Sequence, residues 1–475
     1  MDADEFRKWG KQMVDYVANY WTKLPSRRPQ SNVKPGYMRH LIPEDPPENG
    51  ESFDNIFADL ETVIMQGVTH WHHPRFFAYF PAGNSYPAIM GDILSSGIGA
   101  IGFSWASSPA YTELELAVMD WLAKLVGLPD EFLYSSQGPG AGVIQSTASE
   151  CVYLSMLAAK KLATSNLSDE KSESSFVAYT SDQAHSCVQK AALMIGIRLR
   201  FVESDKSRRM TSEALQSAVE EDKKKGLIPF FVCVTLGTTA CCAFDCLPEI
   251  GPFCQSQKLW LHVDAAYAGC ATICPEYRWI FQGIQHADTI NFNPHKAMMI
   301  NFDCSAFWMK DTRKIEHTFF VDPQYLKYDQ QGLVPDLRHW QIPLGRRFRS
   351  LKLWFTIRAF GADKIRENFR KMCSLAKYFA SLVEKDQNFE IVQPVVLGVV
   401  CFRIKGSNEI NEKAAKIIND KGDIYFSAVT LHDLHVLRLC ISSTMTEKSD
   451  VDFAWQQIKD VANLLLRNGK DAAQR

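Results

Sequence analysis

The sequence lacks several features that would assign a protein to a class at once. No run of about twenty uninterrupted apolar residues occurs in the 475-residue chain, which argues against a membrane span. The first residues, Met-Asp-Ala-Asp-Glu-Phe-Arg-Lys, are charged and contain no apolar core, so they do not resemble a secretory signal. We therefore expect a cytoplasmic protein with no membrane partner.

The chain also has little net charge and no obvious metal-binding pattern. Its 52 basic and 54 acidic residues give a formal charge of -2, which provides no electrostatic attraction for nucleic acid. The thirteen cysteines are scattered and mostly apolar in context, as is typical of reduced, buried thiols. Cys241, Cys242 and Cys246 lie close together, but no second pair at metal-ligand spacing follows them. No metal site is therefore expected.

The apolar pattern predicts an α/β core. Between about residues 81 and 352, short apolar or β-branched runs alternate with helical stretches, which is typical of a parallel sheet covered on both faces. The predicted strands include residues 176–179, 200–202, 229–234, 259–263 and 289–292.

Two smaller parts flank this core. Residues 3–23 and 53–65 repeat apolar positions at helical spacing and are predicted to pack on something outside their own segment. The chain after residue 352 predicts a long helix, strands at 389–392, 399–404 and 436–439, and a final helix. The predicted division is therefore 1–85, an N-terminal helical segment; 86–352, the large α/β domain; and 353–475, a small α+β domain.

Lys296 is the first candidate for chemistry. It ends the segment Asn293-Pro-His-Lys296 and precedes Ala-Met-Met-Ile, so it lies in apolar surroundings. An amine in a dry site can act as a nucleophile or form a Schiff base. Taken alone this signal is weak, because a lysine beside apolar residues usually extends its amine to solvent.

Asp264 strengthens the interpretation. The run from Trp260 to Asp264 reads as a buried strand that ends in a carboxylate and is followed by small residues. Ligands of open α/β sheets bind at the carboxyl ends of strands, and a carboxylate there can keep a pyridine nitrogen protonated. Asp264 and Lys296 are 32 residues apart, about one βαβ crossover. Alone, Asp264 would more simply be a helix N-cap.

Two further segments complete a cofactor site. Residues 137–142, Gln-Gly-Pro-Gly-Ala-Gly, lead into Ser-Thr147-Ala148-Ser149-Glu and a helix, and helix N-terminal amides bind phosphate. The run is neither a Walker loop nor a strict dinucleotide fingerprint. His185 follows Thr-Ser-Asp-Gln-Ala and could stack on a flat cofactor; alone, a core or surface histidine would be the simpler interpretation.

Several long motifs resemble one family. They are WHHPRFFAYFP, TASE, SDQAHS, TLGTTACCAFD, LWLHVDAAYAG, NFNPHK, NFDCSAFW and RHWQIPLGRRFRSLKLW. They resemble the aromatic L-amino-acid decarboxylases, among the group II decarboxylases that use pyridoxal 5'-phosphate (PLP), in the branch of invertebrate dopa decarboxylases and aromatic aldehyde synthases. The resemblance implies a fold-type I PLP enzyme, similar to aspartate aminotransferase, that forms a homodimer with a shared active site.

The resemblance also implies a role for each matching residue. Lys296 would carry PLP as a Schiff base, Asp264 would pair with the pyridine nitrogen, and His185 would stack on the ring and help to place the substrate carboxylate. The other expected cofactor contacts are Thr147, Ala148, Ser149, Thr239, Ala266, Asn293 and His295. The expected substrate pocket consists of Trp71, Tyr79, Phe80, Pro81 and Ala82, with Ile101 and Phe103 entering from the partner subunit. Residues 322–339 would form a mobile loop.

The sequence departs from the family pattern at three of these positions. Leu337 stands where the family's loop has a tyrosine that delivers a proton to the substrate α-carbon, and leucine cannot donate one. Tyr328, His185 or water is left to supply that proton. Ala82 replaces a frequent threonine near the substrate ring, and Ala297 replaces the tryptophan that usually follows the cofactor lysine, so an altered ring preference is expected.

These departures leave the product open. The main prediction is decarboxylation of an aromatic L-amino acid, of the dopa, tyrosine, phenylalanine or tryptophan type, to the arylalkylamine. The alternative is an aromatic aldehyde synthase, in which oxygen intercepts the reaction and gives arylacetaldehyde, ammonia, carbon dioxide and hydrogen peroxide. A second alternative is a weakly active paralogue with a partner or regulatory role.

Overall fold

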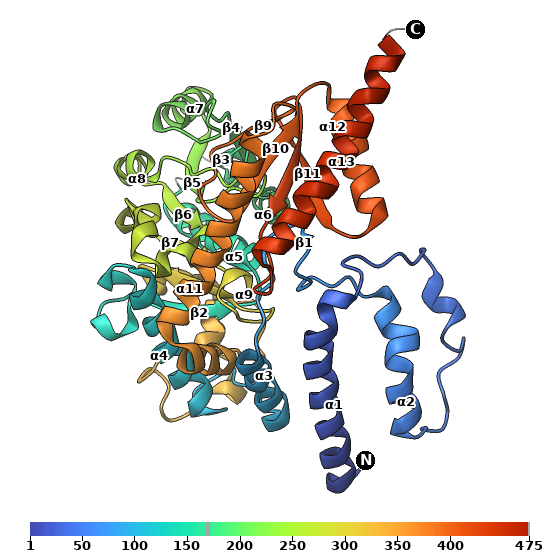
Figure 1. The fold of residues 1–475 in the computed structure, drawn as a ribbon. Coiled ribbons are helices and arrows are strands. Elements are labelled where there is room, and N and C mark those ends of the chain that lie inside the picture. The colour runs from blue at the N-terminus through green and yellow to red at the C-terminus, as the bar shows by residue number, and fades with distance from the viewer. Residues whose placement is uncertain (168–171, 474–475) are drawn as a thin grey trace. The chain divides into compact units, whose positions relative to one another are not determined.

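The computed structural model describes residues 1–167 and 172–473. Its contacts divide the chain into two compact units, Ala82–Cys373 and the combination of Met1–Pro81 with Ser374–Arg475 (Figure 1). The division into three parts drawn from the sequence stays a prediction. Among the described residues, no helix combines the length and the apolar character needed to cross a bilayer.

The unit formed by Ala82–Cys373 is built on a seven-stranded sheet in the order β2-β8-β7-β6-β5-β3-β4. Neighbouring strands pair in parallel, except that β8 runs antiparallel to both β2 and β7. The strands are β2 (Ala141–Gln145), β3 (Phe176–Ser181), β4 (Arg198–Val202), β5 (Ile228–Thr235), β6 (Trp260–Asp264), β7 (Thr289–Phe292) and β8 (Ser305–Met309). The α/β class predicted from the sequence is confirmed.

Helices connect these strands, as a parallel sheet requires. They are α3 (Tyr86–Ile98), α4 (Pro109–Val126), α5 (Ala148–Ser165), α6 (Ser186–Ile195), α7 (Ser212–Lys224), α8 (Leu247–Ser256), α9 (Pro294–Ala297) and α10 (Thr312–Phe319). The long α11 (Ser350–Glu384) is interrupted at Gly361, whose φ of 63° lies in the left-handed region that glycine adopts without steric cost.

The predicted strands match β3, β5, β6 and β7 closely because each is a buried, largely apolar run. The strand predicted at 200–202 matches β4, which begins earlier, at Arg198, and is buried only at Val202. The glycine-rich run precedes and enters β2, which leads to α5, and its glycines allow close packing. A Cβ on Gly140 would lie 1.9 Å from the Glu131 carbonyl oxygen, and one on Gly142 would lie 2.5 Å from the indole nitrogen of Trp308.

The second unit contains a five-stranded sheet in the order β1-β11-β12-β10-β9. Its strands are β1 (Phe76–Phe77), β9 (Phe389–Ile391), β10 (Val399–Ile404), β11 (Tyr425–Leu431) and β12 (Leu434–Cys440), and its helices are α1 (Ala3–Lys23), α2 (Phe53–Asp59), α12 (Asn408–Lys421) and α13 (Lys448–Ala473). The N-terminal segment, predicted as helical only, thus contributes β1, which pairs in parallel with β11.

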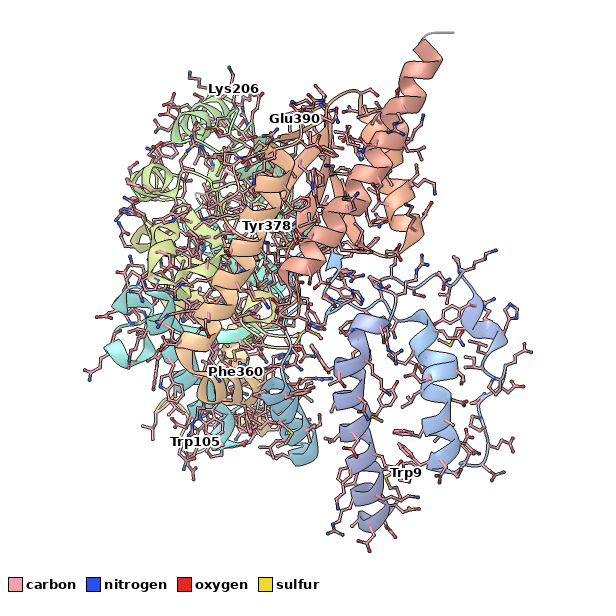
Figure 2. All side chains as sticks on the ribbon, in the orientation of Figure 1. Trp9, Trp105, Lys206, Phe360, Tyr378 and Glu390 are labelled. Atoms are coloured by element: carbon pink, nitrogen blue, oxygen red, sulfur yellow. The ribbon has the colours of Figure 1, made fainter. Side chains whose placement is uncertain are left out.

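Aromatic contacts hold α1 against α2. Trp9, buried on α1, lies 5.2 Å from the ring of Phe53 and 5.7 Å from that of Phe57 (Figure 2). The helix predicted at 3–23 is confirmed. The helix predicted at 53–65 is α-helical only as far as Asp59, and a π-helical turn over Leu60–Ile64 follows it directly.

Candidate active site

The candidate site begins where β6 and β7 end. Asp264 is the last residue of β6 and is paired in register with Asn291 of β7. The backbone N–H of Asn293 donates to the Ala266 carbonyl at 3.0 Å, and that of Lys296 donates to the Asn293 carbonyl at 2.9 Å. The predicted carboxylate and the predicted lysine therefore follow neighbouring parallel strands at the same edge of the sheet, which is where open α/β sheets bind ligands.

Asp264 is held as a hydrogen-bond acceptor. It is buried, and its Oδ1 accepts from the backbone N–H of Ala266 at 3.0 Å and from Nδ2 of Asn291 at 3.2 Å. The hydrogen bond from Ala266 closes a local turn, as a capping aspartate would. The hydrogen bond from Asn291 comes from the neighbouring strand, β7.

The Cys187 thiol shows how closely the predicted residues gather. Burial raises the pKa of Cys187 to about 12, and the negative charge of Asp264 raises it further. A hydrogen bond with Ser149 and the positive charge of Lys296 act in the opposite direction. One thiol on α6 therefore lies within interaction range of residues from α5, β6 and α9, so the structure brings these parts of the predicted site together.

The start of α5 is suited to an anion. Thr147 caps the helix, with Oγ1 accepting from the Glu150 N–H at 3.4 Å. The N–H groups of Ala148 and Ser149 precede any possible acceptor within the helix, and the helix dipole adds positive potential there. The side chain of Glu150 turns back to Ser146, whose N–H and hydroxyl donate to it at 3.1 and 2.5 Å.

Asn293 and His295 present donors on the lysine side. Oδ1 of Asn293 accepts from the Ser305 hydroxyl at 2.7 Å, so its amide NH₂ remains the donor of this side chain. Nδ1 of His295 accepts from the Cys304 N–H at 3.0 Å. Burial lowers the pKa of His295 to about 3, so the ring is neutral at physiological pH and carries its proton on Nε2.

His185 is oriented in the same manner. It is exposed and caps α6, with Nδ1 accepting from the Cys187 N–H at 3.1 Å. A neutral ring then carries its proton on Nε2. Thr239 is also exposed and lies two residues after Gly237, whose φ of 84° turns the chain at the end of β5.

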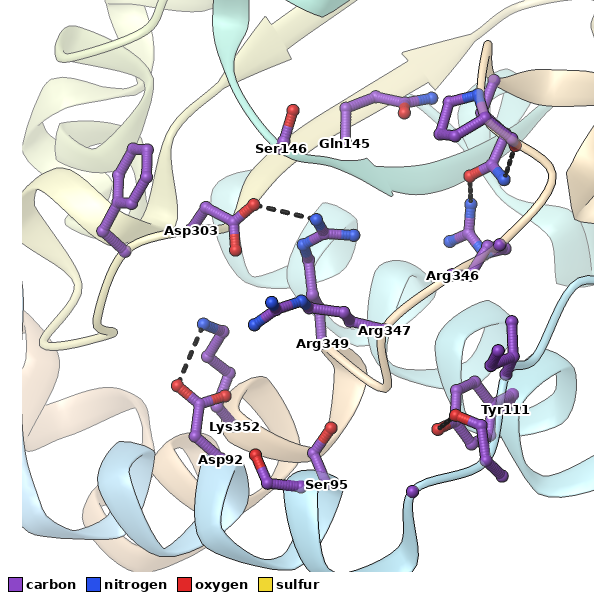
Figure 3. A pocket seen from close by; sticks show the side chains of 18 of the residues that line it. Asp92, Ser95, Tyr111, Gln145, Ser146, Asp303, Arg346, Arg347, Arg349 and Lys352 are labelled. Atoms are coloured by element: carbon purple, nitrogen blue, oxygen red, sulfur yellow. Dashed lines mark hydrogen bonds and ion pairs between the residues drawn. The ribbon is translucent and has the colours of Figure 1, made fainter. Parts of the chain in front are cut away.

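A cavity of about 690 Å³ adjoins the start of α5 (Figure 3). Ser146 and Glu150 line it, and so does Ile101, which the resemblance assigns to the partner's site. Its wall is rich in basic side chains, namely Arg346, Arg347, Arg349 and Lys352. Arg349 pairs with Asp303 at 2.8 Å and Lys352 with Asp92 at 3.4 Å.

The remaining predicted pocket residues divide between the units. Ala82 and Phe103 belong to the same unit as Lys296, whereas Trp71, Tyr79, Phe80 and Pro81 belong to the other. Within that second unit Trp71 stacks on Tyr79 at 5.0 Å, and the Arg438 guanidinium lies 4.5 Å from the ring of Phe80. Tyr79 has a φ of 54°, which is uncommon for a residue other than glycine and clusters at functional sites.

Leu337 lies in the segment predicted to form a mobile loop and is buried. Its side chain is buried in the apolar cluster that also contains Trp340, Phe307 and Met309. The hydroxyl of Tyr328, a candidate for the missing proton donor, is buried as well.

Sequence reasoning missed three buried polar residues beneath this edge of the sheet, His262, Thr289 and Asn291. The signal for them was available. Alternate residues of a strand share one face, so His262 lies on the same face of β6 as Asp264, and Thr289 lies on the same face of β7 as Asn291. In the described ranges, no group of three or more His, Cys, Asp or Glu side chains could hold a metal ion.

A lysine and a carboxylate at adjacent strand ends, with a helix N-terminus and a histidine close by, define a fold-type I PLP enzyme. The model of the pyridoxal-dependent decarboxylase conserved domain matches residues 35–405. The chain belongs to the pyridoxal-dependent decarboxylase family, and its cofactor is PLP. The family inferred from the motifs is thereby confirmed.

Known relatives extend over nearly the whole chain. The aromatic-L-amino-acid decarboxylase of Bos taurus is 50% identical, covering 100% of this chain and 99% of its own length. Among solved structures, Oryza sativa TDC with PLP and tryptamine has a TM-score of 0.95 at 34% identity, covering 98% of this chain and 99% of its own. The 4-hydroxyphenylacetaldehyde synthase of Rhodiola rosea has a TM-score of 0.92 at 36% identity, with the same coverage.

Proposed function

We propose that this protein decarboxylates an aromatic L-amino acid and releases the arylalkylamine. The observation that carries the proposal is the convergence of Lys296, Asp264 and Ser149 around one buried thiol, in a chain that is 50% identical to an aromatic-L-amino-acid decarboxylase. When bound, PLP supplies an electron sink for the electrons that the departing carboxylate leaves behind.

The residues present fit this cofactor. The uncapped N–H groups at the start of α5, the amide of Asn293 and Nε2–H of His295 would donate to the phosphate, with Thr147 shaping the turn. Lys296 would bind the aldehyde carbon, and Asp264, fixed by two donors, would accept from the pyridine nitrogen. Thr239 and Ala266 would lie along the ring.

His185 is the group we assign to the substrate. Because Nδ1 accepts from the Cys187 N–H, the ring presents Nε2–H as a donor. That donor would hold the substrate carboxylate in the orientation that its departure requires, and the bound cofactor would supply the electron sink. Trp71, Tyr79, Phe80, Pro81 and Ala82 would form the aromatic pocket, and Ala82 and Ala297 would leave more room than the threonine and tryptophan of relatives.

We further propose a homodimer with a shared site in the cytoplasm. The support is the exposed apolar face of α3, formed by Tyr86, Met90, Ile93, Leu94 and Ile98 and continued by exposed Ile101. A face of this kind on one helix fits a second copy of the chain, and Ile101 and Phe103 would then enter the partner's site. Ile93→Glu should shift the sedimenting species from dimer to monomer, whereas the surface change Lys206→Glu should not. A wild-type monomer would contradict this proposal.

Product analysis tests the activity. The purified PLP-loaded protein is incubated separately with dopa, tyrosine, phenylalanine, tryptophan and histidine, and carbon dioxide, amine, aldehyde and peroxide are quantified together. We expect carbon dioxide and amine in equal amounts from at least one aromatic substrate. A protein that binds PLP and releases no carbon dioxide from any of them would contradict the proposal and support the weakly active paralogue.

One observation favours aldehyde synthesis as the second candidate. Leu337 cannot donate a proton and is buried in the core of its unit, and a 4-hydroxyphenylacetaldehyde synthase is among the structural neighbours. Aldehyde with an equal amount of peroxide in the same assay would establish this alternative. Amine without peroxide would show that Tyr328, His185 or water supplies the proton.

A further inference from the structure

Beneath the candidate site, a chain of buried polar side chains runs from Trp260 to Asp264. The indole N–H of Trp260 donates to the Ser155 hydroxyl at 2.9 Å and to the Thr289 hydroxyl at 3.2 Å. The two hydroxyls lie 2.6 Å apart, and Thr289 Oγ1 lies 2.9 Å from Nδ1 of His262. Ser155, Thr289 and His262 are completely buried.

The series of buried polar side chains continues from His262 to Asn291. Nε2 of His262 and Oδ1 of Asn291 are buried, and among the described residues neither makes a hydrogen bond of normal geometry, either with the other or with a third group. Burial lowers the pKa of His262 and the Asn291 side chain acts in the opposite direction, so the two side chains lie close enough to interact. On its far side, Nδ2 of Asn291 donates to Oδ1 of Asp264 at 3.2 Å.

The donors and acceptors of this hydrogen-bonded series allow one continuous direction. The Trp260 N–H can only donate, so the hydroxyls of Ser155 and Thr289 both accept from it; in the arrangement that leads toward Asp264, Ser155 donates to Thr289 and Thr289 donates to Nδ1 of His262. Burial lowers the pKa of His262 to about 4, so the ring is neutral and its single proton lies on Nε2. That proton is then available to Oδ1 of Asn291.

The other end imposes the same direction. An ionised Asp264 only accepts, so Asn291 must turn its NH₂ to the carboxylate and its oxygen to His262. An ionised Asp264 therefore selects one arrangement of the asparagine amide, and a series of hydroxyls that donates toward His262 is compatible with it. Titratable groups around Asp264 include the thiols of Cys151, Cys187 and Cys233, whose pKa values are raised by burial, and Lys296, which acts on the same Cys187 thiol. These thiols stay protonated and add no competing charge.

We propose that Thr289, His262 and Asn291 are positioning residues that set the orientation of Asp264 for the cofactor ring. The inference rests on the proposed role of Asp264 at the pyridine nitrogen. None of the three need touch the cofactor. Buried networks of this kind hold a functional group in one geometry when every member has its partner.

Two matched pairs of variants test the proposal. Thr289→Val removes the hydroxyl at constant shape, whereas Thr289→Ser keeps it. His262→Leu removes the donor to Asn291, whereas His262→Gln keeps an amide N–H near the position of Nε2. We measure the dissociation constant for PLP by titrating each apoprotein, kcat and KM for the best substrate, and the unfolding temperature of the apoprotein.

Thr289→Val and His262→Leu should weaken PLP binding by about tenfold or more, as expected for a lost hydrogen bond to a charged group. In both variants kcat should fall while KM changes little. Thr289→Ser and His262→Gln should keep most of the PLP affinity. In an Asp264→Asn background, Thr289→Val should have no further effect on the PLP constant, because coupled residues are not additive.

Other results would overturn the proposal. If Thr289→Val and His262→Leu lower only the unfolding temperature and leave PLP affinity and kcat unchanged, the hydrogen-bonded side chains have only a structural role. If Thr289→Val weakens PLP binding by the same factor with and without Asp264, it does not act through that carboxylate. Failure of the wild-type protein to bind PLP or release carbon dioxide would instead contradict the proposed function.

Discussion

Arg338 donates through Nη2 to Oδ1 of Asp322 at 3.1 Å and so joins two residues at opposite ends of one segment. Its Nε also donates to Asp336 at 2.9 Å, and the Arg338 side chain is only 3% exposed. The neighbouring Leu337 is buried in an apolar cluster. The segment predicted as a mobile loop is therefore fastened at its base, which leaves any motion to the residues between these anchors.

Leu337→Ala should destabilise the protein. Removing a buried leucine side chain loses its transfer free energy and leaves a cavity, at a cost of about 2–5 kcal/mol in the free energy of unfolding. Leu337→Met, which nearly preserves the volume, should cost less than about 1.5 kcal/mol. Urea denaturation measures both. An alanine variant as stable as the wild type would show that this side chain is not packed in the core.

Lys296→Ala should abolish the visible absorption of bound PLP and lower the rate of carbon dioxide release by more than about a thousandfold, because removal of a covalently acting residue has effects of at least this size. Lys310→Ala serves as the control, since Lys310 pairs with Glu131 near the surface. Spectra and carbon dioxide assays of both variants measure the effect. Retention of the visible band in Lys296→Ala would exclude this lysine as the cofactor's attachment point.

Glu115 and Arg346 form a buried ion pair, with side chains 4% and 2% exposed. Glu115 also accepts from the Ile144 N–H at 2.8 Å. Replacing only Arg346 with Met should cost about 3–5 kcal/mol, because a buried charge is left unpaired. Adding Glu115→Leu should recover part of that loss. The prediction fails if a denaturation-based double-mutant cycle shows simple additivity.

Stability should fall on acidification, in part through His73. Burial lowers the pKa of His73 from its ordinary value of 6.5 to about 4. Between these two values the unfolded chain binds more protons than the folded one, so the free energy of unfolding decreases as the pH falls from about 7 to 4. In His73→Gln this dependence should be weaker by up to about 1.4 kcal/mol per pH unit.

Asp245 acts in the opposite sense, since burial raises its pKa to about 7, but it is present in both proteins and cancels in the comparison. Denaturation series at pH 5 and 7 measure the slopes. The exposed-histidine change His40→Gln controls for the general loss of an imidazole. Parallel slopes for wild type and His73→Gln would contradict the prediction.

The predictable parts of this protein are those encoded over short stretches of chain. The strands matching β3, β5, β6 and β7 could be predicted because each is a largely apolar run. Asp264 and Lys296 could be identified because Asp264 ends one of these runs and Lys296 follows another within a few residues. The partner of β1 could not be predicted, because Phe76 pairs with Tyr425 from a distant part of the chain and a two-residue strand has no periodicity to detect.

The surroundings of individual side chains could not be predicted from the sequence either. At position 337 the sequence showed only that a proton donor was missing, whereas its burial depends on packing between segments that are remote in the chain. The glycines at 140 and 142 suggested a phosphate loop, but only the folded sheet shows that they admit the Glu131 carbonyl and the Trp308 indole.

The sequence by itself determined the α/β class, because strand patterns are local, and the PLP cofactor, because long motifs resemble a known family. The residues that it assigns to the chemistry stay predictions. Only the tertiary structure decided how Asp264 is held. Its link to Trp260 through Thr289, His262 and Asn291 exists because β6 and β7 lie side by side in one register, and hydrogen bonds between strands depend on that register.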